Sequence, residues 1–518
     1  MKKDFTGSTD DFRNGKALTF DHYDRSQLKT GIVHIGPGAF FRGHIATYVE
    51  DLARAGDLDW GITGISLRSG ETRDKLATQD YLYTVTAQSV DGNTTDTVGC
   101  LQNIIVAKEA PQDAINALTN PDVKIVTLTV TQSGYYIDQN TKQLDFSHPD
   151  IVNSLGEGQD TTTAIGLIVA ALDARRQAGL PAFTVMSCDN LPGNGHVIAN
   201  AVLAYAAQKS RELREWISKN VSFPNTMVDR IVPRYDRGHS EELYARTGLC
   251  DDAPIYTEPF KQWVIEKTDN LGLPDFPSVG ATLADDVYPF ELMKIRLLNG
   301  AHMALGIVGR LSGYEYDCEA MADADVQTFV RGFMAESAQT LPAIEGIDFD
   351  EYQEAIAQRL IDSSQQDELA RLARTGSQKV TSRFIEPLQE AVSKDMDTRH
   401  LAFSIAGWFY YLKCKDVNGE PMDIFDPEAA RTGLMEVAKR SNGDPRPLMG
   451  IGANGQSLFG HSLVYSKSFV AAVESYLHDI CEGGMKSALE KFVGNEGVLD
   501  LGLFPDEEGK GSPPPPAA

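Results

Sequence analysis

GIVHIGPGAF, at residues 31–40, predicts a short buried strand followed by a glycine-rich turn and a helix that runs to about Ala55. Such a turn brings backbone N–H groups close to a pyrophosphate at the start of a helix, where the dipole favours negative charge. The dinucleotide-binding pattern G-x-G-x-x-G has a third glycine, and this chain has Phe41 at that position. Gly36 and Gly38 are therefore candidate cofactor residues that this stretch alone does not establish.

Three further runs rich in β-branched residues predict buried strands, at 60–67, 124–130 and 182–188. Their lack of alternation is typical of strands covered on both faces of a parallel sheet. A helix predicted at 163–179 separates the last two strands.

The turn after the strand at 60–67 bears on the choice of cofactor. A dinucleotide-binding fold usually carries an acidic residue here, which binds the ribose 2′-hydroxyl. This chain has Arg68 and Ser69 instead, and Glu71 comes slightly later. Arginine and serine suit a 2′-phosphate, so NAD and NADP both stay open, and a solvated turn explains these residues equally well.

Two polar residues of the first half are candidates for substrate contacts. Asn190 follows the strand at 182–188, and the carboxyl ends of strands border the ligand crevice in open α/β sheets; a simple turn is the alternative. Asp229 lies next to Arg230 inside the apolar segment 223–233. An isolated buried charge is costly, so structural ion pairing is the default explanation for both.

From about residue 286 amphipathic helices replace strands. They are predicted at 318–341, 350–361, 365–375, 399–414, 426–441 and 468–493. The chain is therefore predicted to be an α/β protein with a Rossmann-type parallel-sheet domain at 30–285 and a mostly α-helical domain at 286–505. A polar leader, 1–29, and a proline-rich disordered tail, 506–518, flank these domains.

The first helix of the second half, DVYPFELMKIRLLNGAHMALGIVGR at 286–310, is apolar in nearly every direction apart from Lys294, Asn299 and His302. At 100° per residue these three fall within one half of the helix circumference. Burial lowers the pKa of a lysine, which is a route to a lysine that acts as a base. The alternative is a lysine that extends to solvent. The helix begins at the domain boundary, where ligand sites are common.

Composition and charge limit the possible partners. The chain has 518 residues and a net charge of −26, which argues against nucleic acid or an anionic membrane surface as partner. Six scattered cysteines without a C-x-x-C pair suit a reducing cytoplasm and no metal site. No apolar run is long enough to span a membrane. Both a monomer and a dimer fit the sequence.

Taken together, these segments resemble the polyol-specific long-chain dehydrogenases, a family of mannitol, sorbitol and arabinitol dehydrogenases and fructuronate reductases. GIVHIGPGAFFRGH (31–44) is similar to the family turn G-x-G-x-F-x-R-x-H. TLTVTQSGYY (127–136), AFTVMSCDN (182–190) and FPNTMVDRIVP (223–233) follow in family order. So do QDYLYT (79–84), EPFKQWVIE (258–266) and the K-x4-N-x2-H of the helix at 286–310.

The resemblance implies a metal-independent hydride transfer between a nicotinamide cofactor and a polyol, with roles for particular residues. Lys294 is the implied general base, Asn190 and Asn299 are the implied donors to the reacting oxygen, and His302 binds a neighbouring hydroxyl. Glu291 is the implied proton path. Asp229 and Arg371 match polyol-contacting positions, and Lys379 joins them, although solvated surface is the default explanation for Arg371 and Lys379. The predicted cofactor-binding residues are Gly36, Gly38, Phe40, Arg42, Arg68, Ser69, Thr129 and Thr131.

The chain departs from many relatives at T-x-T-E, where it has Gln132 in place of the glutamate. The prediction is an NAD(P)-dependent polyol dehydrogenase, with D-mannitol and D-fructose as substrates and NAD favoured over NADP. A fructuronate reductase and an arabinitol or sorbitol dehydrogenase are the alternatives within the class. A catalytically silent cofactor-binding protein is the alternative from another class.

Overall fold

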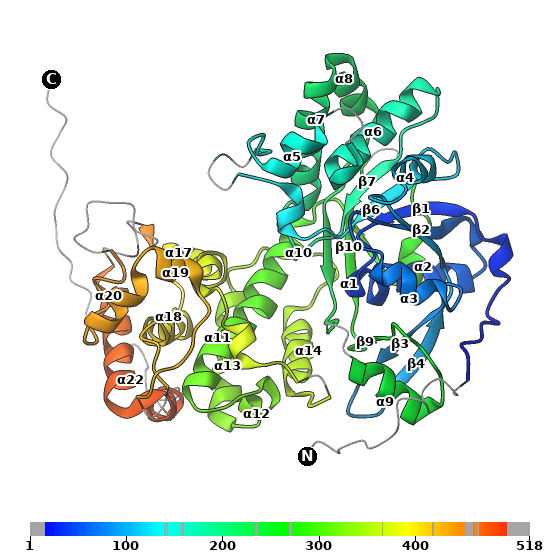
Figure 1. Cartoon of the computed structure of the whole chain (residues 1–518). Coiled ribbons are helices and arrows are strands. Elements are labelled where there is room, and N and C mark those ends of the chain that lie inside the picture. The colour runs from blue at the N-terminus through cyan, green and yellow to red at the C-terminus, as the bar shows by residue number, and fades with distance from the viewer. Residues whose placement is uncertain are drawn as a thin grey trace, which may run out of the picture. The chain divides into compact units, whose positions relative to one another are not determined.

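The computed structural model of the chain divides into two compact units, 1–291 and 292–518. The described residues are 16–494 without 139–140, 142, 157–159, 234–236, 269–271, 365, 417–418, 451–458, 461–462 and 464–465. The tail predicted at 506–518 and most of the predicted leader lie outside them. The first unit is the mixed α/β part of the chain and the second is helical (Figure 1).

A five-stranded parallel sheet with the order β5-β2-β1-β6-β7 forms the centre of the first unit. Its strands are β1 (Thr30–Ile35), β2 (Gly61–Ser66), β5 (Leu101–Val106), β6 (Ile125–Leu128) and β7 (Thr184–Ser187). The strand order turns back at β1, which has β2 on one side and β6 on the other. The predicted fold class, a Rossmann-type sheet domain followed by a helical domain, is confirmed.

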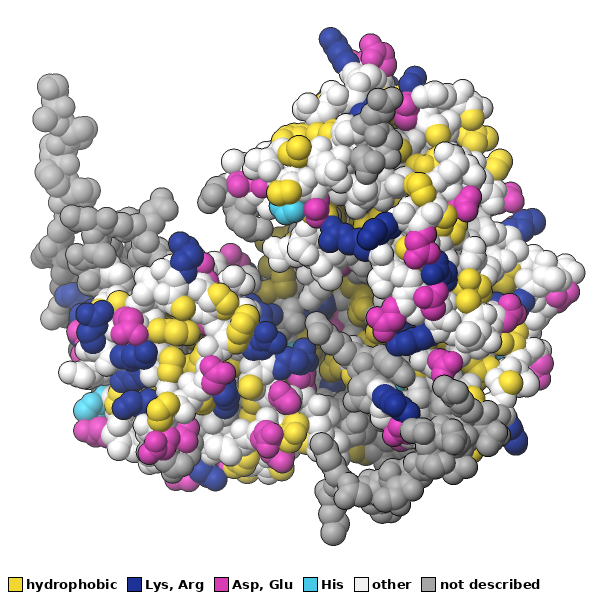
Figure 2. Space-filling view, in the orientation of Figure 1, with side chains coloured by type: hydrophobic (Ala, Val, Ile, Leu, Met, Phe, Trp, Pro, Cys, Tyr) yellow, Lys and Arg dark blue, Asp and Glu magenta, His cyan; other side chains and the backbone are white. Residues whose placement is uncertain are grey.

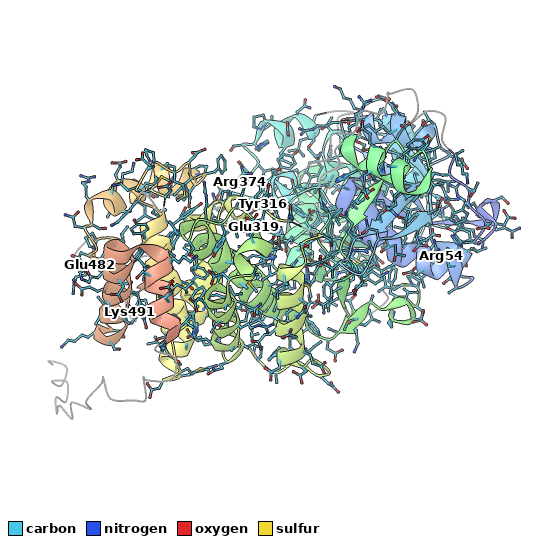
Figure 3. All side chains as sticks on the ribbon, turned by 90° about the horizontal axis from the view of Figure 1, so that it is seen from below. Arg54, Tyr316, Glu319, Arg374, Glu482 and Lys491 are labelled. Carbon is cyan, nitrogen blue, oxygen red and sulfur yellow. The ribbon has the colours of Figure 1, made fainter. Side chains whose placement is uncertain are left out.

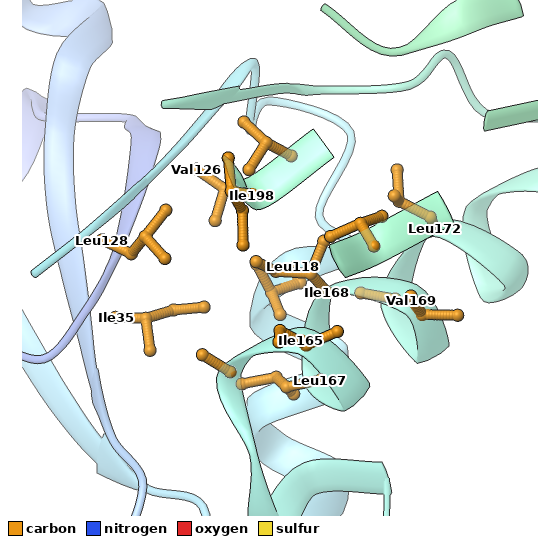
Figure 4. Packing of buried hydrophobic residues seen from close by; sticks show 14 of the residues in the cluster. Ile35, Leu118, Val126, Leu128, Ile165, Leu167, Ile168, Val169, Leu172 and Ile198 are labelled. Carbon is orange, nitrogen blue, oxygen red and sulfur yellow. The ribbon is translucent and has the colours of Figure 1, made fainter. Parts of the chain in front are cut away.

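Apolar residues on both faces of the sheet explain the buried strands. Val33 and Ile35 pack with helix residues such as Ile165 and Ile198 on one face (Figure 4), whereas Ile32 packs with α2 on the other. The helices are α1 (Ala39–Gly43), α2 (Ile45–Arg54), α3 (Glu71–Ala77), α4 (Pro111–Leu118), α5 (Pro149–Ser154), α6 (Ala164–Gln177), α7 (Asn194–Lys209), α8 (Arg211–Asn220) and α9 (Arg237–Thr247). The single helix predicted up to about Ala55 is wrong, because His44 leaves helical geometry between α1 and α2.

Two three-stranded sheets complete the first unit, β4-β3-β9 and β11-β10-β8. Their strands are β3 (Tyr83–Ala87), β4 (Thr94–Val98), β8 (Thr226–Asp229), β9 (Ile255–Thr257), β10 (Gln262–Glu266) and β11 (Thr282–Ala284). The sequence did not predict β3, β4 or β5, whose residues are largely polar or follow turns.

The helical unit begins inside the stretch that was predicted as one helix. Its helices are α10 (Tyr288–Met293), which spans the division between the units, α11 (Gly300–Leu311), α12 (Asp317–Met321), α13 (Ala324–Ala338), α14 (Phe349–Ile361), α15 (Leu369–Leu372), α16 (Gly376–Val380), α17 (Glu386–Ser393), α18 (Arg399–Tyr411), α19 (Pro427–Arg431), α20 (Leu434–Arg440) and α22 (Lys467–Gly494). Two π-helical turns interrupt them, at Lys294–Asn299 and Thr381–Ile385.

Several predicted helices are shorter than the sequence pattern suggested. The helix predicted at 318–341 is two helices, because Asp323 caps the start of α13 with its side chain. The helix predicted at 426–441 is also two helices, because Gly433 lies between them with a φ of 74°. The helix predicted at 365–375 is only the four residues of α15, since Thr375 has a left-handed φ of 53°.

Exposed ion pairs are frequent on both units, and acidic and basic side chains are intermixed on the face shown in Figure 2. Many join neighbouring turns of one helix, such as Arg211 with Glu215 in α8. Such pairs each contribute little to stability because water screens them. Buried polar groups matter more.

Asp317 is a buried carboxyl group whose ionisation should weaken the helical unit. Its Oδ1 accepts N–H bonds from Cys318 and Asp367, at 2.8 and 3.0 Å. Burial raises its pKa from the ordinary 3.8 to about 7. Because the folded chain holds this proton more tightly than the unfolded chain, the stabilising contribution is complete below about pH 4 and is lost as the pH rises towards 7.

Asp317→Asn keeps the acceptor oxygen and removes the ionisation. We expect the variant to be more stable than the parent by on the order of 3 kcal/mol at pH 8 and to differ little at pH 4. Urea unfolding of both proteins across this range tests it. A stability difference that does not change with pH would contradict the assignment.

Candidate active site

Four parallel strands of the central sheet end at one edge, and most of the predicted cofactor residues lie there. Gly36 follows β1, Arg68 and Ser69 follow β2, and Thr129 and Thr131 follow β6. Asn190 follows β7 along the same edge. Parallel pairing explains why residues far apart in sequence meet there.

Gly36 makes the tight turn after β1 possible. Its φ is 92°, and a Cβ atom there would lie 2.3 Å from the carbonyl oxygen of Thr129. Its N–H donates to Ile65 O at 2.9 Å, and its own carbonyl accepts bonds from Gly38 N and Thr129 Oγ1, at 2.7 and 2.9 Å. A Cβ at Gly38 would meet only Gly36 O, at 3.8 Å, so the backbone there is open to a large anion. This turn fits a dinucleotide pyrophosphate.

His34 supports the turn from below and is a residue that sequence reasoning missed. Its Nδ1 lies 2.8 Å from Thr127 Oγ1 and its Nε2 lies 3.0 Å from Thr129 Oγ1. The ring is fully buried and stacks on Phe41, with centroids 3.7 Å apart. Burial lowers the pKa of His34 to about 3, so the imidazole is neutral at physiological pH.

Asp189 is a second missed residue, and it fixes the loop after β6. Its carboxylate accepts N–H bonds from Val130 and Thr131, both at 2.9 Å, and an O–H bond from Tyr135 at 2.8 Å. Thr131 has a φ of 63°, a strained value for a residue with a side chain. The carboxylate therefore holds a strained backbone segment beside the cofactor turn. Gln132, where many relatives have glutamate, is exposed at the start of the next short turn.

The remaining predicted cofactor residues lie in different surroundings. Arg68 is largely exposed and pairs with Asp150, and Ser69 accepts a bond from Ser66 through its carbonyl. Phe40 stacks on His44, with centroids 5.1 Å apart. Arg42 is buried and donates to Ala253 O at 2.7 Å, which ties α1 to the segment before β9.

Asn190 lies in a turn that Glu291 reaches from α10. The buried Glu291 carboxylate accepts the N–H of Gly193 at 2.9 Å, and Gly193 precedes α7 with a φ of 60°. Asp229 ends β8, opposite Gln262 of β10, and is 5% exposed. Arg230, for which structural ion pairing was the default expectation, donates through its guanidinium to the carbonyls of Gly43 and Glu258.

In the helical unit, Lys294 is the first residue and Asn299 the last of a π-helical turn. Lys294 and Asn299 would be roughly 140° apart on the α-helix predicted for this stretch, and they lie closer together here because i→i+5 hydrogen bonding widens the turn. Lys294 is only 6% exposed. His302 follows in the first turn of α11 and is partly buried. The π turn therefore gathers the polar residues of this stretch more closely than an α-helix would.

Arg383 ties this π turn to the second one and was not predicted. It lies in the π turn Thr381–Ile385, and its Nη1 donates to the carbonyl of Asn299 at 3.0 Å. Burial lowers the pKa of Arg383 to about 10. It still carries its charge at neutral pH.

Arg383 and two more arginines form a basic cluster around Lys379. The other two arginines are Arg371 and Arg374 (labelled in Figure 3), and Lys379 Nζ donates to Arg374 O at 2.6 Å. Arg371 is 60% exposed and forms a two-point pair with Asp367. Burial and the three arginines lower the pKa of Lys379 to about 8. Such a cluster suits a polyhydroxy or anionic ligand.

The described residues form neither a metal-binding group nor a membrane-spanning helix. Among them, no three His, Cys, Asp or Glu side chains come together as a metal-binding group. In that same part of the chain, no helix is both long and apolar enough to cross a bilayer.

Comparison with known proteins identifies the class. The model of the mannitol dehydrogenase Rossmann domain matches residues 30–274, and that of the mannitol dehydrogenase C-terminal domain matches residues 286–481. The chain belongs to the mannitol dehydrogenase family. The prediction of a nicotinamide-dependent oxidoreductase of the polyol dehydrogenase class is thereby confirmed.

Individual relatives are similar over nearly their whole length. Mannitol 2-dehydrogenase of Aspergillus fumigatus is 36% identical over 489 residues, which are 92% of this chain and 96% of the relative. Mannitol dehydrogenase 2 of Saccharomyces cerevisiae is 35% identical, over 92% of this chain and 95% of its own.

Two solved structures share the whole architecture. A substrate-free D-sorbitol dehydrogenase has a TM-score of 0.85 and 32% identity, over 90% of this chain and 96% of its own. The Pseudomonas fluorescens mannitol 2-dehydrogenase, solved as a ternary complex with NAD and D-mannitol, has a TM-score of 0.76 and 36% identity, over 91% and 96%.

Proposed function

We propose that this protein is a mannitol 2-dehydrogenase that interconverts D-mannitol and D-fructose with NAD as the favoured cofactor. The observation that carries the proposal is the buried Lys294 at the start of a π turn that ends at Asn299. π turns are rare and often occur at functional sites. The full-length similarity to mannitol 2-dehydrogenases supports the choice of substrate.

In the proposed mechanism Lys294 accepts the proton of the hydroxyl group that is oxidised. The amides of Asn190 and Asn299 donate hydrogen bonds to the same oxygen as negative charge develops on it. His302 orients a neighbouring hydroxyl, and Glu291 relays the proton between the lysine and water. The nicotinamide cofactor, when bound, supplies the hydride acceptor, so the reaction needs no metal.

Binding residues complete the proposal. Asp229, Arg371 and Lys379 hold the polyol chain. The turn of Gly36 and Gly38, with the backbone at Thr129 and Thr131, holds the pyrophosphate and nicotinamide side of the cofactor. Arg68 and Ser69 lie where the adenosine ribose is expected. Phe40 and Arg42 support the turn from α1.

A substrate panel tests the assignment. Reduction of fructose, xylulose, sorbose and fructuronate should be measured with NADH and with NADPH, with and without a chelator. We expect fructose with NADH to give the highest kcat/KM and the chelator to have no effect. Cofactor binding without turnover of any of these ketoses would instead favour the catalytically silent protein.

The basic cluster around Lys379 favours a second candidate, a hexuronate reductase. Four basic side chains, Arg371, Arg374, Lys379 and Arg383, are close enough together to affect the ionisation of Lys379. A neutral sugar does not require so much positive charge, whereas a carboxylate suits arginine donors.

The pH dependence of KM separates the two candidates. Lys379 loses its charge above about pH 8, because burial and the nearby arginines lower its pKa. For fructuronate we expect KM to rise about tenfold between pH 7 and pH 9.5 through the loss of one charge-assisted contact. KM for fructose should change much less. Equal KM profiles for both substrates would argue against a carboxylate at Lys379.

A further inference from the structure

The turn after β2 carries an ion pair that reaches across to α5. Arg68 Nη2 lies 2.6 Å from Asp150 Oδ2, and the hydroxyl of Tyr136 donates to the same oxygen at 3.1 Å. The side chains are 66% and 42% exposed, so the pair faces solvent and breaks at little cost. Among the described residues, Asp150 Oδ1 accepts no hydrogen bond.

This ion pair lies where a Rossmann-type fold selects between NAD and NADP. β2 is paired with β1, and the N–H of Gly36 bonds to the carbonyl of Ile65, so the two turns are neighbours. An acidic residue near the end of β2 ordinarily binds the 2′-hydroxyl, while an arginine accommodates a 2′-phosphate. Here the first acidic residue after the strand, Glu71, pairs with Lys75 along α3 and is 74% exposed.

Asp150 comes from a fixed element rather than from a loose loop. The side chain of His148 accepts the N–H of Asp150 at the start of α5, at 3.2 Å, and the ring of His148 contacts Tyr136. Ile151 and Ser154 are buried, and Ser154 O accepts the hydroxyl of Tyr205 at 2.6 Å. The carboxylate is therefore held beside Arg68.

We infer that Asp150 determines the cofactor preference, because it supplies from α5 the carboxylate that is missing after β2. With NAD, the ion pair stays intact and Oδ1 accepts the ribose 2′-hydroxyl. With NADP, the 2′-phosphate would face an arginine whose charge is already neutralised by Asp150, together with the negative charge of that carboxylate. The inference rests on the proposed dinucleotide site. It identifies the preferred cofactor as NAD, whose adenosine ribose carries a free 2′-hydroxyl.

The test uses two probes without a nicotinamide ring, 5′-AMP and adenosine 2′,5′-bisphosphate. Their dissociation constants are measured by calorimetry on the full-length protein. For Asp150→Asn we expect the bisphosphate to bind about tenfold more tightly and 5′-AMP a few-fold more weakly. Protein-fluorescence titration with NAD and NADP should show the same direction.

Two further variants control the result. Asp59→Asn removes a comparable exposed carboxylate that pairs with Lys29 at the opposite end of the strands, and it should leave the ratio of the two constants unchanged. Arg68→Ala in the Asp150→Asn background should abolish the gain for the bisphosphate.

A ratio of the two dissociation constants in Asp150→Asn that lies within twofold of the parent's ratio would overturn the inference. A parent protein that binds neither probe would also overturn it. Failure of the proposed function is a separate result. A shifted ratio in a protein that oxidises no polyol would support the role of Asp150 and contradict the mannitol assignment.

Discussion

Lys294→Ala is expected to lower kcat by about 10³-fold while the affinity for NAD stays within twofold of the parent. The proposed base lies in the helical unit, whereas the glycine turn belongs to the sheet unit, so chemistry and cofactor binding should separate. Lys294→Met, which fills the same volume without an amine, should show the same loss. Steady-state kinetics gives kcat, and fluorescence titration with NAD gives the dissociation constant of the cofactor.

Lys439→Ala is the matched control, because Lys439 is an exposed residue of the same unit that pairs with Glu436. Its kcat should equal that of the parent. Partial recovery of Lys294→Ala by added methylamine would support an amine acting as the base. A kcat within tenfold of the parent in both Lys294 variants would exclude the lysine as general base.

Gly36→Ala is expected to have the second large effect, on cofactor binding and stability together. The new Cβ would lie 2.3 Å from Thr129 O at a φ of 92°, so the turn must move. We expect a loss of about 3 kcal/mol in the free energy of unfolding. The dissociation constant for NAD should rise about 30-fold, as if two backbone hydrogen bonds were lost.

Gly56→Ala separates the two causes of that loss. Gly56 has a similar φ of 99°, but a Cβ there would meet no atom within 4 Å. Gly56→Ala should lower the free energy of unfolding by about 1 kcal/mol through the backbone conformation alone, and it should leave NAD binding unchanged. If the two variants are equally destabilised, the contact with Thr129 is not what the glycine avoids.

Much of the fold could be predicted because local patterns dominate it. β1, β2, β6 and β7 are buried runs rich in β-branched residues, and the strands predicted from these runs place Gly36 and Asn190 at the sheet edge, as in the structure. Thr129 was predicted inside the strand at 124–130 and instead follows β6. The strands β3 and β4 pair with each other as neighbours in sequence, but they could not be predicted in this way because their sequences, YTVTA and TTDTV, are rich in threonine rather than apolar. Helix breaks such as that at His44 depend on tertiary contacts, here a bond from its ring to Gln262 O.

The residues that support the proposed site could not be predicted from local patterns. Asp189 and His34 act on backbone and side-chain groups more than 50 residues away, and no local pattern connects them. Arg383 stabilises the carbonyl of Asn299 from another helix for the same reason. A buried lysine, by contrast, is visible in the sequence because it interrupts an apolar stretch.

The π turn at Lys294–Asn299 also acts as a phase shift in the helix. Each helical residue advances the direction of the side chains by about 100°, so one extra residue in a turn rotates everything beyond it by nearly that amount. The length of this turn therefore sets the angle around the helix axis between the face of α11 that carries His302 and the face of α10 that carries Glu291. Loss of a single apolar residue between Lys294 and Asn299 would restore α-helical geometry and leave His302 facing nearly the same way, whereas the present sequence folded as a plain α-helix would turn His302 by roughly 90°.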